Sequence, residues 1–317
     1  MASLAGGSAE RSRFAEEVRE GLARPRKALS PKWLYDARGG ALYERICEQP
    51  EYYPPRTEAA ILAAHAAEIA EAVGPGALVF EYGAGSARKT VKLLATLERP
   101  AAYVAADISP ESLRAGEEAV RARFPRLALR SVVADFTAPV RLPLGDLRCV
   151  RRVAFFPGST IGNFDPPDAV ALLARMARDA GPDGGLLVGV DAPKDGPTLV
   201  RAYDDAQGVT ADFNLNLLTR VNRELGGNFR PGAFRHRSIW DPERSRVEMH
   251  LESLEAQTVS VAGATFRFEA GETIHTESAY KWEPRVFDAI ALAAGWRPQR
   301  LWTDERGWFS VMLYRTA

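Results

Sequence analysis

The pattern of hydrophobic and polar positions divides the chain into segments of different character. Residues 12–74 follow helical spacing, with a break at "EQPEYYPPRTE", where Pro50, Pro54 and Pro55 prevent a continuous helix. Short apolar runs then alternate with helical stretches, namely "ALVFEYG", "AYVAADIS", "LRSVVADF", "RVAFFPGST" and "GGLLVGVDA". Apolar strands that lack polar alternation and are separated by helices predict a parallel sheet covered on both faces.

The stretch from Gly196 to Lys281 does not continue this alternation. It predicts a helix over "PTLVRAYDDAQGVTADFNLNLLTRVNREL" and then strands with period-two patterning in "AFRHRSIWD", "RVEMHLESLEAQTVSV" and "ATFRFEAGETIHTES". The tail returns to a helix in "EPRVFDAIALAAG" and two apolar runs, "RPQRLWTD" and "WFSVMLYRT". We therefore predict a core domain and a second lobe, with these boundaries: 76–195 and 282–317 for the core, 1–75 and 196–281 for the helical segment and inserted lobe.

Composition narrows the expected partners to small molecules. The 317 residues are 46% hydrophobic and carry 41 basic and 41 acidic side chains, so no net field attracts nucleic acid. Cys47 and Cys149 lack the spacing of a zinc or dithiol site, and we expect reduced thiols and no metal. The chain has neither a long apolar run nor a signal-peptide pattern at its start, so we expect a cytoplasmic protein that does not bind membranes. We also expect a monomer.

The segment "FEYGAGSARKT" is the first candidate binding element. Gly83 and Gly85 follow a predicted strand and precede a helix, where a doubly wound sheet binds its cofactor. The third glycine of the dinucleotide fingerprint is missing. The loop alone is therefore equally consistent with a tight strand-to-helix turn.

Two later strand ends strengthen the cofactor interpretation. Asp107 could accept hydrogen bonds from both ribose hydroxyls of an adenosine, and Asp135 and Phe136 suit the exocyclic amine and one face of an adenine. Each aspartate could instead cap a helix. NAD and S-adenosylmethionine both fit this pattern. A final antiparallel strand pair is typical of methyltransferases and favours S-adenosylmethionine, whose sulfonium needs little acid–base assistance.

The motifs "LYDARGGALYERICEQPEYYPPRTE", "EYGAGSARKT", "FFPGSTIGNF" and "AYDDAQGVTADFNLNLL" are found together in this chain. From about Leu34 to Tyr314 the chain resembles the histidine-specific S-adenosylmethionine-dependent methyltransferase family. The resemblance implies an α/β class I methyltransferase fold, which is a Rossmann-like, doubly wound sheet with an antiparallel end strand, plus a second α+β substrate-binding lobe. It also implies methylation of the α-amine of L-histidine to Nα,Nα,Nα-trimethylhistidine (hercynine), a step of ergothioneine biosynthesis.

The resemblance also implies roles for individual residues. Contacts to S-adenosylmethionine are implied for Gly83, Lys89, Asp107, Asp135 and Phe136, and we expect Gly85 of the same loop to contribute as well. Tyr53 is implied to line the amino-acid pocket and Asn163 to hold the substrate's amine and carboxylate region, and we expect both to orient the reacting amine. Tyr203 is implied to bind the substrate carboxylate, with Thr210 in the same pocket. Met249 is expected in the pocket wall and Glu277 at the imidazole. From the residues alone, Tyr53 and Tyr203 could be ordinary half-buried aromatics and Glu277 a solvated strand residue.

One departure from the family pattern leaves the acceptor open. The family commonly has serine two residues after the glutamate, whereas this chain has Ala279. Either Ser278 or a water compensates, or the substrate is a different aromatic amino acid or a histidine derivative. A remoter alternative is an NAD-dependent dehydrogenase, although no histidine has an obvious catalytic setting. A non-catalytic S-adenosylmethionine-binding protein is disfavoured by the joint presence of the loop glycines, Asp107 and Asn163.

Overall fold

The chain divides into two compact units, each built from segments that are distant in the sequence. The computed structural model describes the backbone of residues 2–317 and the side chains of residues 11–317. The first unit contains the chain up to Tyr52 together with Asp195–Ala279, and the sheet unit contains Tyr53–Lys194 together with Tyr280–Ala317. Residues 53–75, which we predicted beside the inserted lobe, belong to the sheet unit because α3 (Pro54–Ala64) packs on β12 (Phe309–Thr316).

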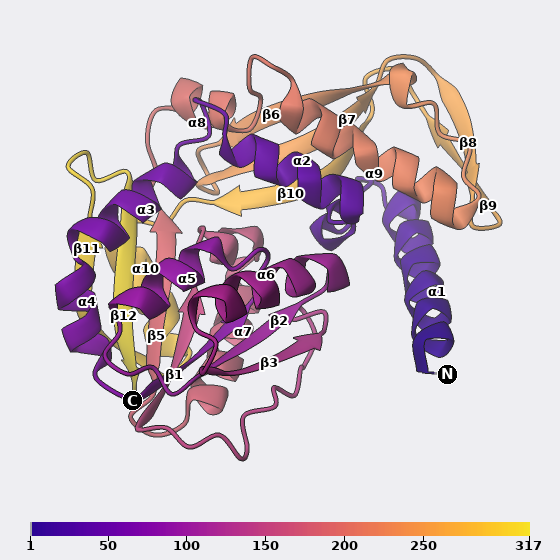
Figure 1. Ribbon diagram of the computed structural model, residues 1–317. Helices are drawn as coiled ribbons and strands as arrows, with labels where there is room; N and C mark the ends of the chain where they lie inside the picture. Colours follow the sequence, from indigo (N-terminus) through magenta and orange to yellow (C-terminus); the bar gives the residue numbers. More distant parts are fainter. Residues whose placement is uncertain (1) are drawn as a thin grey trace. The chain divides into compact units, whose positions relative to one another are not determined.

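The sheet unit is built on seven strands in the order β11-β12-β5-β4-β1-β2-β3 (Figure 1). Five of them are parallel: β1 (Ala77–Tyr82), β2 (Ala102–Asp107), β3 (Ala128–Val133), β4 (Arg151–Phe156) and β5 (Gly185–Asp191). Strand β12 lies antiparallel to both β5 and β11 (Trp296–Thr303). The predicted doubly wound sheet with an antiparallel end is confirmed.

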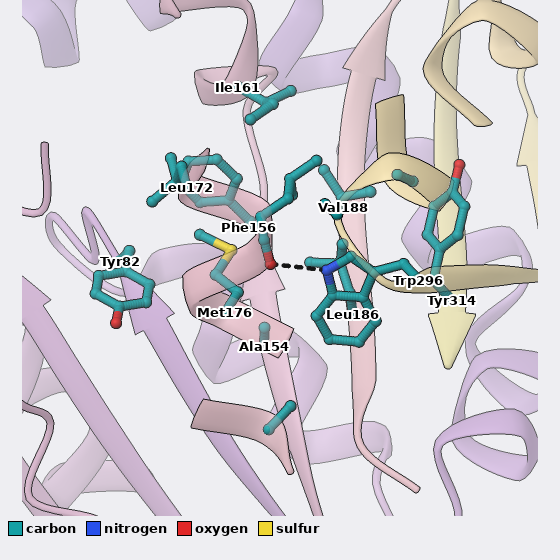
Figure 2. Close-up of a cluster of buried hydrophobic side chains, with 14 of the residues drawn as sticks. Tyr82, Ala154, Phe156, Ile161, Leu172, Met176, Leu186, Val188, Trp296 and Tyr314 are labelled. Atoms are coloured by element: carbon teal, nitrogen blue, oxygen red, sulfur yellow. Dashed lines mark hydrogen bonds between the residues drawn. The ribbon is translucent and has the colours of Figure 1, made fainter. Parts of the chain in front are cut away.

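Helices cover both faces of this sheet, as the apolar strands require. Helices α7 (Pro166–Ala180) and α10 (Pro284–Ala293) cover one face. The other face is covered by α3, α4 (Ala66–Val73), α5 (Arg88–Thr96) and α6 (Pro110–Arg123). Figure 2 shows the core beneath α7, where Trp296 Nε1 donates to the backbone carbonyl of Leu173 at 2.9 Å. The packed core fixes the carboxyl ends of the strands, from which the candidate site residues project.

The first unit combines helices with two small sheets. Its helical elements are α1 (Ala2–Ala23), η1 (Pro31–Leu34), α2 (Ala37–Cys47), α8 (Gly196–Ala202), α9 (Val209–Leu225) and η3 (Pro231–Ala233). Its strands are β6 (Phe234–Asp241), β7 (Arg246–Ser253), β8 (Gln257–Val261), β9 (Ala264–Phe268) and β10 (Thr273–Tyr280). The strand orders are β10-β7-β6 and β8-β9, and α9 packs on β6, β7 and α2.

The long helix predicted after residue 196 is interrupted. A turn separates α8 from α9, and Gly208 adopts φ +70° at its end. The carboxylate of Asp205 accepts the N–H groups of Val209 (2.9 Å) and Thr210 (2.7 Å), which satisfies the first donors of α9. This local capping outcompetes continuation of the helix through Tyr203. In the described part of the chain, no helix combines the length and hydropathy of a membrane span.

Candidate active site

The loop after β1 makes a tight turn directly against an aromatic ring. Gly83 and Gly85 have φ values of +75° and +51°, and the Gly83 N–H donates to the carbonyl of Ala106 at 2.8 Å. A Cβ atom on Gly83 would lie 3.1 Å from Cε1 of Phe136. Glycine is therefore required both for the left-handed backbone and for the approach of Phe136. The structure thus brings together Gly83 and Phe136, both of which we predicted to contact the cofactor.

Asp107 holds the glycine loop from the end of β2. Its Oδ2 accepts the Gly85 N–H at 2.9 Å, and its Oδ1 accepts the Ser109 N–H at 2.8 Å. The hydroxyl of Ser109 caps α6, which excludes the helix-cap alternative for Asp107. Burial raises the pKa of Asp107, and the backbone donors oppose that rise. Each carboxylate oxygen can accept more than one hydrogen bond, so the arrangement fits a ribose diol.

Asp135 and Phe136 form the turn that follows β3. Asp135 Oδ1 accepts the N–H (3.0 Å) and the hydroxyl (2.5 Å) of Thr137, and no helix begins at this turn. The ring of Phe136 lies 6.1 Å from that of Tyr82 and 6.2 Å from that of Phe156. One edge of Phe136 therefore joins the core while the residue reaches the glycine loop, a position suited to an adenine ring.

Lys89 makes an ion pair that we did not predict. Its ammonium contacts the carboxylate of Glu58, which is 1% exposed and also accepts the Gly158 N–H at 2.9 and 3.0 Å. A Cβ atom on Gly189 in β5 would lie 1.9 Å from Glu58 Oε1, so only glycine leaves room for this carboxylate. Glu58 thus connects α5, the turn after β4 and the middle of β5. A contact from Lys89 to the cofactor stays a prediction.

Glu81 is a buried acid within the glycine-loop motif. It accepts hydrogen bonds from the hydroxyls of Thr90 and Tyr103, the latter at 2.6 Å. Burial raises the pKa of Glu81 to about 8, although both donors oppose the shift. The side chain is therefore mostly protonated at neutral pH, and it fixes β1 to α5 and β2.

Tyr53 belongs to a buried charged cluster at the end of β5. Its hydroxyl donates to Asp191 Oδ2 at 2.7 Å. Lys194 Nζ donates to the Tyr53 hydroxyl at 2.5 Å and to Asp191 Oδ1 at 2.7 Å, while Lys281 Nζ lies 2.9 Å from Asp191 Oδ2. We call Tyr53, Asp191, Lys194 and Lys281 the Asp191 cluster. The hydroxyl proton of Tyr53 goes to a carboxylate, so its oxygen is oriented to accept a hydrogen bond.

Asn163 is attached to the same strand end through its own turn. It closes η2 (Thr160–Asn163), which follows Ser159 at φ +56°. The Ser159 hydroxyl oxygen accepts the backbone N–H of Asp191 at 3.0 Å. The two residues predicted at the reacting amine, Tyr53 and Asn163, therefore belong to elements joined at Asp191, within the sheet unit.

The first unit holds the other predicted substrate residues. All five are buried: Tyr203, Thr210, Met249, Glu277 and Ala279. Burial raises the pKa of Tyr35, and the nearby charges of Glu277, Tyr43 and Tyr203 raise it further. The ring of Tyr52 meets that of Tyr203 edge-on at 5.8 Å. Glu277 and Tyr203 therefore lie around one group of tyrosines.

Several contacts fix the backbone around Tyr203 and Met249. His236 Nε2 donates to the Tyr203 carbonyl at 2.7 Å, which leaves Nδ1 to accept from Asn214 Nδ2 at 3.0 Å. Burial lowers the pKa of His236, which favours this neutral form. The Met249 carbonyl accepts the Thr276 hydroxyl at 3.0 Å. These side chains hold the strands and the turn in place.

Comparison with known proteins decides the family. Residues 14–316 match the family described as histidine-specific methyltransferase, SAM-dependent. The chain belongs to this family. It is 41% identical over 303 residues to a histidine N-alpha-methyltransferase of Mycolicibacterium smegmatis, covering 94% of this chain and 93% of that protein. A protein of the same name from Mycobacterium tuberculosis is 38% identical over 319 residues, covering 99% and 98% of the two chains.

More distant relatives carry broader names. The N-methyltransferase imqF of Aspergillus flavus is 29% identical over 301 residues, covering 92% of this chain and 82% of that protein. The family membership makes the chain an S-adenosylmethionine-dependent methyltransferase, and it confirms the predicted enzyme class. Among the described residues, no three His, Cys, Asp or Glu side chains are grouped so as to hold a metal ion.

Sequence reasoning missed several residues of this methyltransferase site. Asp191 ends its apolar run as Asp107 ends another, and this shared pattern could have identified it. Lys194, three residues later, gave no comparable signal. The first unit contributes further tyrosines near Glu277, of which Tyr35 and Tyr43 stand in the same motif as Tyr53.

Ala279 occupies the position of the family serine in this methyltransferase, and Ser278 is the neighbouring residue that could replace the missing hydroxyl. Ala279 is 4% exposed on β10, beside Glu277 in the same strand. The hydroxyl of Ser278, which we considered as a replacement, lies 3.0 Å from Nε2 of His275. Ser278 is thus already engaged by a neighbouring side chain, which weakens its candidacy as a substrate contact.

Proposed function

We propose that this methyltransferase transfers methyl groups from S-adenosylmethionine to the α-amine of L-histidine and produces Nα,Nα,Nα-trimethylhistidine (hercynine). The observation that carries the proposal is the buried carboxylate of Glu277, whose charge is among the causes that raise the pKa values of Tyr35 and Tyr43, after burial in both cases. A carboxylate among aromatic side chains is well suited to accept an imidazole N–H in a charge-assisted hydrogen bond. The two bacterial relatives named histidine N-alpha-methyltransferase support the same substrate.

The residues of the sheet unit fit the cofactor. We propose that Asp107 binds the ribose hydroxyls, that Asp135 and Phe136 bind the adenine, and that the loop of Gly83 and Gly85 admits the methionine part. S-adenosylmethionine, when bound, supplies an electrophilic methyl group on a sulfonium. The Gly83 backbone approaches Phe136 closely, and Gly85 has open space where a Cβ atom would stand, both of which suit close contact with a ligand.

The remaining side chains position the amino acid. We propose that the oxygen of Tyr53 and the amide of Asn163 orient the reacting amine, because Asp191 holds their elements at one strand end. The hydroxyl of Tyr203 is proposed to bind the substrate carboxylate, with Thr210 near it. Alignment of a nucleophile with an activated methyl group provides most of the catalysis that such a reaction needs.

A second substrate assignment is favoured by one observation. Alanine at position 279 lacks the hydroxyl of the family serine, which follows Glu277 by two residues. The neighbouring Ser278 hydroxyl already makes a hydrogen bond with His275. A site with fewer polar partners discriminates less against a side chain that lacks polar atoms. The alternative acceptor is therefore another aromatic amino acid or a histidine derivative. The monomeric state, the cytoplasmic location and the lack of a metal stay predictions.

Mass spectrometry of reaction products tests the proposal. The protein is incubated with S-adenosylmethionine and, separately, with histidine, tryptophan, tyrosine, phenylalanine and Nα-methylated histidines. We expect histidine to gain three methyl groups and S-adenosylhomocysteine to accumulate in step with them. If tryptophan or tyrosine is methylated and histidine is unchanged, histidine is not the substrate. If no amino acid is methylated, the proposed function is refuted.

A further inference from the structure

The Asp191 cluster places two amines against one carboxylate. Lys194 and Lys281 both contact Asp191, at 2.7 and 2.9 Å. The side chains are 4% and 1% exposed, and that of Asp191 is fully buried. Burial penalises charge, and two ammonium groups held against the same carboxylate repel one another. The cluster is therefore built so that one lysine can lose its proton at moderate pH.

Lys194 is the amine whose surroundings favour loss of the proton. Its Nζ lies 4.4 Å from the ring centroid of Tyr53 and 5.7 Å from that of Trp308. Burial lowers the pKa of Lys194 to about 8, helped by the charge of Lys281 and opposed by Asp191.

The other charged groups near Lys194 come from the turn between β11 and β12. The charge of Asp304 opposes the lowering of the Lys194 pKa. The guanidinium carbon of Arg306 lies 5.0 Å from the centroid of the Trp308 ring, which Lys194 also approaches. A carboxylate and a guanidinium from the same turn partly offset one another. The neutral amine of Lys194 is thus accessible near physiological pH.

We propose that Lys194, acting through the hydroxyl of Tyr53, accepts the proton that the substrate's α-ammonium loses before each methyl transfer. The proposal rests on the proposed function, which places Tyr53 at the reacting amine. The contact that carries it is the 2.5 Å separation between Lys194 Nζ and the Tyr53 oxygen. Asp191 keeps both groups in position through its two oxygens.

The proton transfers balance without another reactant. With Lys194 protonated, its Nζ donates to the Tyr53 oxygen and the Tyr53 hydroxyl donates to Asp191; once Lys194 has lost a proton, the Tyr53 O–H turns to the lysine lone pair. An N–H bond of the substrate ammonium then breaks and its proton goes to the Tyr53 oxygen, while the Tyr53 O–H proton goes to the lone pair of Lys194. The free amine then bonds to the methyl carbon, and the electron pair of the broken C–S bond stays on sulfur as S-adenosylhomocysteine forms. Lys194 returns its proton to water before the next transfer.

The test compares Lys194→Met and Lys194→Arg with the unmodified protein. Methionine removes the amine with little change in side-chain length, and arginine keeps a positive charge but cannot accept a proton. Lys92→Met on the exposed face of α5 is the matched control. Initial rates at saturating S-adenosylmethionine and amino acid are measured from about pH 6 to about pH 10. Calorimetric titration gives the affinity for S-adenosylmethionine separately.

We expect both Lys194 variants to lose kcat by about 10²–10³-fold at pH 7, because a positioned base contributes on this scale. The deficit should shrink as the pH rises and the substrate amine deprotonates in solution. Affinity for S-adenosylmethionine and the Lys92→Met rates should not change. If Lys194→Met does not fold, Lys194→Arg decides, since it retains donors for Asp191.

Two results would overturn the proton-acceptor role. The first is a Lys194→Arg enzyme as fast as the unmodified protein, because charge alone would then suffice. The second is a Lys194→Met enzyme that keeps the pH profile of the unmodified protein or loses the same factor at every pH, as a purely structural residue would. Rates are measured with whichever amino acid the product panel identifies. Failure of histidine as a substrate is therefore distinguishable from failure of the role of Lys194.

Discussion

Replacement of Gly189 by alanine tests how tightly the sheet depends on one buried carboxylate. The added methyl carbon would lie 1.9 Å from Oε1 of Glu58 and 3.0 Å from Cε1 of Phe309. Glu58 is 1% exposed and is held by Lys89 and by the Gly158 N–H. The carboxylate can leave only by giving up those partners.

The expected cost follows from these contacts. Loss of a hydrogen bond to a charged group costs about 1.5–3 kcal/mol, and overpacking a close-packed interior adds about 1–3 kcal/mol. Lys89 is about a quarter exposed, so water recovers part of its lost ion pair. We therefore expect Gly189→Ala to lower the free energy of unfolding by about 3–5 kcal/mol.

Differential scanning calorimetry measures the effect. For a chain of 317 residues a loss of 1 kcal/mol lowers the melting temperature by about 1.5 °C, so the variant should melt roughly 4–8 °C lower. Gly145→Ala is the control, because Gly145 is exposed and nothing lies within 4 Å of the position its Cβ would occupy. The control should melt within about 2 °C of the unmodified protein.

A double variant separates the clash from other effects of the methyl group. Glu58→Ala removes the carboxylate that Gly189→Ala would strike and leaves only the 3.0 Å contact with Phe309, so Gly189→Ala should cost much less stability in the Glu58→Ala background than in the unmodified protein. The steric argument would be refuted if the losses of stability in the two single variants added up in the double variant. It would also be refuted if Gly189→Ala melted at the same temperature as the Gly145→Ala control.

Three further predictions concern other sites. Glu277→Gln should weaken histidine binding by about 10–100-fold, because a charge-assisted hydrogen bond becomes a neutral one. Calorimetric titration should show this loss with the affinity for S-adenosylmethionine unchanged. A variant that binds histidine as tightly as the unmodified protein would show that Glu277 does not bind the imidazole. Glu81 has its pKa raised from 4.5 to about 8 in the folded state, so it stabilises the fold most below pH 4.5 and loses this contribution as the pH rises to 8. Denaturation of Glu81→Gln should therefore show a shallower fall of stability with pH than the unmodified protein, and identical slopes would contradict the assignment. Gly40→Ala fills open space within α2 and should raise stability by about 0.5–1 kcal/mol, which the shift of the urea midpoint measures; a loss of stability would show that the helix tolerates no side chain there.

The parts of the fold that depend on local pattern were predictable from sequence. The apolar runs, the glycine turn and the acidic strand end at Asp107 are each defined within a few neighbouring residues. The antiparallel final strands were predictable because the turn between them is short. The break before α9 was missed because it depends on a capping contact from Asp205, which helical periodicity does not reveal.

The parts of the site that depend on distant contacts were not predictable. Tyr53 and Asp191 are 138 positions apart, and Lys281 reaches the same carboxylate from a third segment. Charged residues are usually exposed, so neither Lys194 nor Lys281 indicated from its sequence neighbourhood that it would be buried. Resemblance to the family supplied Tyr53 and Glu277, and only the structure shows which groups surround them.

The position of β12 has a consequence for the order in which the protein can fold during synthesis. Strand β5 pairs with β4 on one side and with β12 on the other, yet β12 is made more than a hundred residues after β5. The entire inserted segment leaves the ribosome while the outer edge of β5 has no partner of its own. An unpaired apolar edge is a site of aggregation. Slow translation between the insert and the final strand would therefore lower the yield of native protein.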